Sequence, residues 1–84
     1  MGKTVTGRFP GMRRDHKWTV LQLSNQIAII RSKNRIAAIH LKSGMTRLSK
    51  PISKDISIAH ITEAAGGREV LCPVGIIKQI KELL

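Results

Sequence analysis

The sequence predicts a small α+β domain with a mostly antiparallel sheet, a flexible basic N-terminal arm and a short C-terminal helix. Length is the first observation, because 84 residues suffice for one domain only. Composition is the second, since 42% hydrophobic and 24% charged residues are typical of a folded globular chain and not of a disordered one. The third is the succession of short Ile-rich and Val-rich runs, which favours strands.

Residues 1–17, MGKTVTGRFPGMRRDHK, predict the arm, and residues 18–84 the globular domain. The arm contains three glycines, one proline and five basic residues. Phe9-Pro10-Gly11 is a turn signal, because the residue before a proline is driven out of helical geometry. Phe9 and Met12 are the side chains that could attach the arm to the domain. We expect the arm to be mobile until a partner binds.

Four apolar runs follow, and each predicts a strand of a meander. They are WTVLQL (18–23), IAIIR (27–31), RIAAIHL (35–41) and MTRLSKPI (45–52). Polar segments separate the runs, and two of them, Ser-Lys-Asn (32–34) and Lys-Ser-Gly (42–44), suit hairpin loops because Gly and Asn tolerate positive φ.

A helix-turn-helix is the alternative for residues 19–42. Val20, Leu23, Ile27 and Ile30 recur at helical spacing, so residues 19–31 and 35–41 could form two helices. The density of β-branched residues favours the strands.

The C-terminal third begins with a segment, residues 55–67, whose pattern fits a strand and a helix equally. Residues 68–74 then predict a strand that Pro73 ends. The last ten residues, GIIKQIKELL, predict a short amphipathic helix, with Ile76, Ile77, Ile80, Leu83 and Leu84 on its apolar face.

The net charge of +10 predicts a polyanionic partner. It is uneven, because residues 1–54 hold twelve basic residues and one acidic residue, whereas residues 55–84 hold three and four. We therefore predict a nucleic-acid-binding face in the first part and a packing or dimerising role for the second. The predicted nucleic-acid-binding residues are Arg8, Arg13, Arg14, Lys17, Arg31, Lys33, Arg35, Lys42, Arg47, Lys50 and Lys54.

Duplex DNA, bound through its phosphates in a regulatory or architectural role such as transcription regulation, is the predicted target. Proteins that read single strands stack bases on aromatic side chains, and this chain has one Trp, one Phe and no Tyr. We expect Trp18 to anchor the core instead of binding bases. Structured RNA remains an alternative, since double-stranded RNA is also recognised by shape and phosphates.

Two other classes stay open. A small basic ribonuclease would use His40 or His60 as general acid or base, although we expect no enzyme because no spacing brings such groups together. An interaction module or inhibitor would place the basic half on an acidic protein.

Metals and cofactors are not expected, because one cysteine and three scattered histidines offer no ligand set. Cys72 is predicted to be a small buried apolar residue. The longest apolar runs have four residues, which excludes a signal peptide or membrane span and predicts a cytoplasmic or nucleoid-associated protein that is not secreted. A homodimer through a sheet edge or the C-terminal helix is expected of so small a domain.

Overall fold

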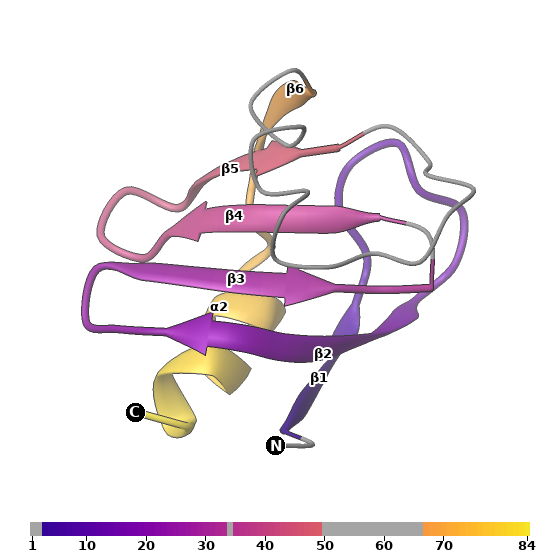
Figure 1. Cartoon of the computed structure of the whole chain (residues 1–84). Helices are drawn as coiled ribbons and strands as arrows, with labels where there is room; N and C mark the ends of the chain where they lie inside the picture. The colour runs from indigo at the N-terminus through magenta and orange to yellow at the C-terminus, as the bar shows by residue number, and fades with distance from the viewer. Residues whose placement is uncertain (1–2, 34, 50–66) are drawn as a thin grey trace.

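A computed structural model describes residues 3–33, 35–49 and 67–84. It contains one antiparallel sheet whose six strands follow chain order, and a helix after the last strand (Figure 1). The elements are β1 (Thr4–Gly7), β2 (His16–Leu23), β3 (Ile27–Arg31), β4 (Ile36–His40), β5 (Met45–Leu48), β6 (Arg68–Leu71) and α2 (Val74–Glu82). The predicted class, a small α+β fold with an antiparallel meander and a C-terminal helix, is confirmed.

The strand prediction for residues 19–42 is confirmed, and the helix-turn-helix alternative is wrong. Pairing explains the outcome, because β2, β3 and β4 form consecutive antiparallel ladders in which Ala28 faces Ile39 and Ile30 faces Ala37. A β-bulge between Val20 and Gln22 interrupts the ladder of β2 with β3. Bulged strands twist more strongly, which helps this sheet to curve.

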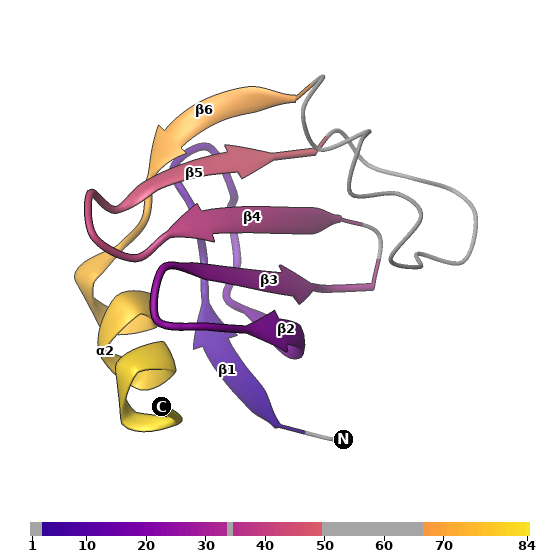
Figure 2. The same cartoon turned by 60° about the vertical axis from the view of Figure 1, so that its left-hand side comes forward.

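The main core lies between the sheet and α2 (Figure 2). Trp18 and Phe9, 0% and 1% exposed, meet edge to face with ring centroids 5.2 Å apart. From α2, Ile76 and Ile80 enter the same cluster, as their helical spacing predicts. Cys72 is also buried there, as expected from the sequence.

Gly44 and Ser24 stabilise two of the hairpin turns. Gly44 closes the β4–β5 turn at φ +80°, a conformation that other residues rarely adopt. Ser24 closes the β2–β3 turn, where its hydroxyl accepts a hydrogen bond from the Ile27 amide at 3.1 Å. The bond within the β2–β3 turn helps to fix the register of these two strands.

The expected arm over residues 1–17 requires correction, because residues 3–17 are part of the folded domain. Residues 4–7 form β1, which pairs with residues 16–19 of β2, and Val5 opposite Trp18 is 1% exposed. Phe9 is buried as well. Burial of these two apolar side chains gives the segment the stabilisation that an arm lacks. The expectations for residues 50–52 and 55–66 lie outside the described residues.

The outer edge of β1 is contacted by a side chain of α2. The Thr6 amide donates a hydrogen bond to Gln79 Oε1 at 2.9 Å, and Gln79 Nε2 donates one to the Thr6 carbonyl at 2.7 Å. The Gln79 side chain of α2 therefore satisfies the backbone N–H and C=O of Thr6 at the edge of β1.

No helix in the described part of the chain is long and apolar enough to cross a membrane.

Candidate nucleic-acid interface

An antiparallel meander sends alternate connections to opposite ends of its sheet. The β1–β2 loop, the β3–β4 turn and the start of β6 belong to one end, and the β2–β3 and β4–β5 turns belong to the other (Figure 1). The first of these ends, which we call the basic end, carries Arg8, Arg13, Arg14, Lys17, Arg31, Lys33, Arg35 and Arg68. Asp15 is the acidic residue in its β1–β2 loop. The fold thus places most of the basic residues of the described ranges at one end of the sheet.

The β1–β2 loop, residues 8–15, is held against the core. Its Phe9 ring is buried, and the Met12 amide donates a hydrogen bond to the Phe9 carbonyl at 3.0 Å. Trp18 contributes from β2, where its Nε1 donates to the Gly7 carbonyl at 3.0 Å. The arginines of this loop therefore start from a fixed backbone.

Two guanidinium groups in this region are held by main-chain carbonyls. Arg8 Nη1 donates to the Arg13 carbonyl at 2.9 Å, and Arg68 Nη2 donates to the Pro10 carbonyl at 2.5 Å. A carbonyl is neutral, so each guanidinium keeps its whole charge and its remaining donors while losing side-chain freedom. Preorganised, uncompensated arginines suit the binding of an anion, because part of the ordering entropy is lost before the ligand arrives.

Arg68 was not among the residues predicted from the sequence. It lies in the part of the chain with little net charge, and its hydrogen bond to Pro10 spans 58 residues. A contact of that range leaves no periodic signal in the sequence. The nearest hint was its position at the start of a predicted strand, beside a turn.

The remaining predicted residues are not all brought together. Lys42 is exposed in the β4–β5 turn, at the end of the sheet opposite the basic end. Arg47, in β5, forms an ion pair with Glu69 of β6 at 2.6 Å, which offsets its charge. Lys50 and Lys54 lie outside the described residues. Lys17, Arg31, Lys33 and Arg35 do lie toward the basic end, with the lysines exposed.

Gly11 permits the contact between the loop and β6. Its φ of +92° is disfavoured for other residues, and an added Cβ would overlap the Arg68 guanidinium. We expect Gly11→Ala to lower the free energy of unfolding by about 1–3 kcal/mol. Urea denaturation followed by circular dichroism measures this change.

Gly75 provides the matched control. It lies in the first turn of α2, and an added Cβ there meets no atom within 4 Å. Gly75→Ala should be neutral or stabilise the protein by up to about 1 kcal/mol. Equal destabilisation by both substitutions would contradict the role given to Gly11.

The histidines and the cysteine in the described residues do not converge on a reactive site. His40 is the last residue of β4, at the end opposite the basic end, whereas His16 begins β2. Among the described residues, no group of three or more His, Cys, Asp or Glu could hold a metal ion. Burial raises the pKa of the Cys72 thiol to about 11, although hydrogen bonds with Thr46 and Ile77 oppose the shift. The thiol is therefore neutral at physiological pH.

Comparisons of the chain with protein-family models, curated proteins and solved structures find no match. The residues and their geometry alone support the functional proposal.

Proposed function

We propose that the protein is a non-catalytic nucleic-acid-binding protein that holds duplex DNA through its phosphates at the basic end. The observation that carries this proposal is the pair of guanidinium groups, Arg8 and Arg68, fixed by carbonyls within a cluster of further basic residues. A solubility role would instead scatter both signs of charge over the surface. We further propose a regulatory or architectural task for it in the cytoplasm or nucleoid.

The positions of the aromatic residues support a duplex over a single strand. Trp18 is 0% exposed and Phe9 is 1% exposed, and the chain has no other aromatic residue of the Phe, Trp or Tyr type. Neither ring is available as a platform for successive bases. Charge and shape are then the means of recognition, and these suit a phosphate backbone.

The fold changes the mechanism expected from the sequence. An arm that orders on contact would lose conformational entropy on binding, whereas the β1–β2 loop is already packed through Phe9 and hydrogen-bonded to Arg68. The loop arginines thus approach the duplex from a formed surface. Phosphate contacts of this kind position a protein without reading sequence.

Salt dependence tests the proposal. If about five phosphates are neutralised, the logarithm of the association constant should fall with the logarithm of salt concentration with a slope of roughly −4 to −5. Fluorescence anisotropy of a labelled duplex of 20 base pairs, titrated between low and physiological salt, measures it. Affinity independent of salt would contradict the phosphate mechanism.

The same assay separates the alternatives. Structured RNA that binds more tightly than the DNA duplex at physiological salt would replace DNA as the proposed target. Cleavage of labelled RNA on a gel would indicate the ribonuclease, with His40→Ala as the first variant to examine. Binding to neither polymer would favour the protein-interaction module.

A homodimer, if it forms, would use β6. The apolar residues Ile76 and Ile80 of α2 are buried against the same chain's sheet, and Gln79 occupies the edge of β1. β6 is the other outer strand of the described sheet.

A further inference from the structure

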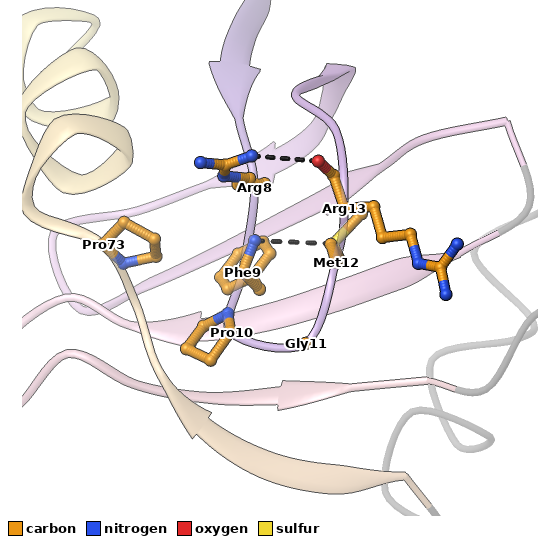
Figure 3. Close-up of a pocket in the computed structure, with 7 residues that line it drawn as sticks. All are labelled: Arg8, Phe9, Pro10, Gly11, Met12, Arg13 and Pro73. Carbon is orange, nitrogen blue, oxygen red and sulfur yellow. Dashed lines mark hydrogen bonds between the residues drawn. The ribbon is translucent and has the colours of Figure 1, made fainter.

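A pocket of about 500 Å³ lies where the β1–β2 loop passes the residue that precedes α2 (Figure 3). Its lining combines apolar and cationic groups from two distant parts of the sequence. These residues are Arg8, Phe9, Pro10, Gly11, Met12, Arg13 and Pro73. It is a depression that is largely open to solvent, so a ligand would lie on the surface against these residues and would not be enclosed.

The pocket is formed before any ligand binds. Phe9 is fixed in the core by its edge-to-face contact with Trp18, and its amide donates a hydrogen bond to Met12 Sδ at 3.4 Å. On the other side of the loop, Arg68 binds the Pro10 carbonyl. Proline rings add little flexibility of their own, so Pro10 and Pro73 are rigid walls.

Arg8 supplies the charge of the pocket. Figure 3 shows its guanidinium beside the Arg13 carbonyl, to which it donates at 2.9 Å, while the Arg13 side chain extends away. Arg8 is bound to this neutral carbonyl, whereas Arg47 is paired with the carboxylate of Glu69. A planar guanidinium with unused donors can bind a phosphate and can also stack on a flat ring.

This combination points to a nucleotide. A base is flat and largely apolar on its faces, which suits Pro10, Pro73 and the thioether of Met12, while its phosphate suits Arg8. Bases inside a duplex are paired and stacked and cannot enter, whereas an unpaired nucleotide at an end or bulge can. The pocket belongs to the loop that we assign to phosphate binding, so one nucleic acid could occupy both.

We propose that this pocket binds one unpaired nucleotide of the nucleic acid, with the base against the apolar walls and the phosphate on Arg8. The proposal rests on the proposed function and adds a preference among ligands. The protein would favour duplexes that carry an overhang or bulge over uninterrupted duplexes.

Three versions of one duplex test the preference by anisotropy. The first is blunt, the second has one unpaired 3′ nucleotide, and the third has an abasic unit in its place. We expect the unpaired nucleotide to tighten binding about tenfold over the blunt duplex, because burial of roughly 50–60 Å² of the apolar face of the base, at about 25 cal/mol per Å², corresponds to that factor. The abasic unit should give much less.

Conservative variants localise the effect. Arg8→Lys keeps the charge but removes the planar guanidinium, and Pro10→Ala removes a wall, so each should reduce the preference to about twofold or less. Arg14→Lys is the matched control, because Arg14 is an exposed arginine of the same loop that does not line the pocket. It should leave the preference intact. Circular dichroism confirms that each variant is folded.

The outcomes distinguish this proposal from the general one. Tight, salt-dependent binding of all three duplexes with equal affinity would overturn the nucleotide pocket and leave DNA binding standing. Binding of none would overturn the proposed function itself. A preference that survives both Arg8→Lys and Pro10→Ala, or that the abasic unit reproduces, would contradict the assigned pocket. Free adenosine monophosphate binding as tightly as the overhang duplex would assign the pocket to a free nucleotide instead.

Discussion

Replacement of Trp18 by Ala is expected to remove a large part of the stability of the protein. Trp18 is fully buried, meets the Phe9 ring at 5.2 Å, and donates a hydrogen bond to the Gly7 carbonyl. Truncation of a buried Trp costs about 3–5 kcal/mol, and a domain of this size has a total stability of roughly 4–13 kcal/mol. Urea denaturation monitored by far-ultraviolet circular dichroism measures the loss without depending on the indole signal.

Two companion variants identify the cause of that loss. Trp18→Phe keeps a ring beside Phe9 but removes the indole donor to Gly7, so it should cost about 1–3 kcal/mol. Leu71→Ala removes an apolar side chain that is 61% exposed and should change stability by less than about 0.5 kcal/mol. A loss below about 1 kcal/mol for Trp18→Ala would show that the loop and β1 do not depend on this residue.

The fold was predictable wherever a local pattern decided it. Short runs rich in Ile and Val, bounded by Gly, Asn and Ser, predicted β2 to β5, and apolar residues spaced by three and four predicted α2. Both patterns are local properties of the sequence. The burial of Trp18 and of Cys72, each expected separately, is confirmed.

The N-terminal segment was not predictable in this way. Val5 and Phe9 are isolated apolar residues among glycines and charges, and neither creates a periodic signal. Their burial depends on pairing with β2 and on the Arg68 contact with Pro10, which is distant in sequence. Tertiary contacts therefore converted a segment with the composition of a mobile arm into a strand and an anchored loop.

The excess of positive charge at the candidate site was predictable from the sequence, but the positions of its residues in the fold were not. Successive hairpin turns of a meander fall at opposite ends, which separates Lys42 from Lys33 although the two are close in sequence. Pairing of β5 with β6 places Glu69 beside Arg47 and brings Arg68 to the loop. Net charge cannot report these placements, because it carries no information on position.

The second large effect is expected on duplex binding, and it depends on where the positive charges lie on the protein. Arg13→Gln, Arg14→Gln and Lys33→Gln together remove three exposed charges from the basic end. Loss of about three phosphate contacts should weaken duplex binding roughly 10-fold to 100-fold at physiological salt and make the salt slope shallower by about three. None of these side chains belongs to the described core, so the fold should be unaffected.

The control removes the same charge from elsewhere. Lys42→Gln, Lys78→Gln and Lys81→Gln alter exposed residues of the β4–β5 turn and α2 that are not among the residues of the basic end. Both triple variants have a net charge of +7, three below the +10 of the natural chain. Any effect of total charge is therefore equal in the two proteins.

The salt slope of duplex binding by these two variants, measured side by side, tests most directly whether the basic end is the binding surface. We predict a shallower slope and weakened binding for the basic-end variant, and a slope close to that of the natural protein for the control. Equal slopes and equal affinities in the two variants would contradict a localised interface and reduce the role of the charge to a general attraction.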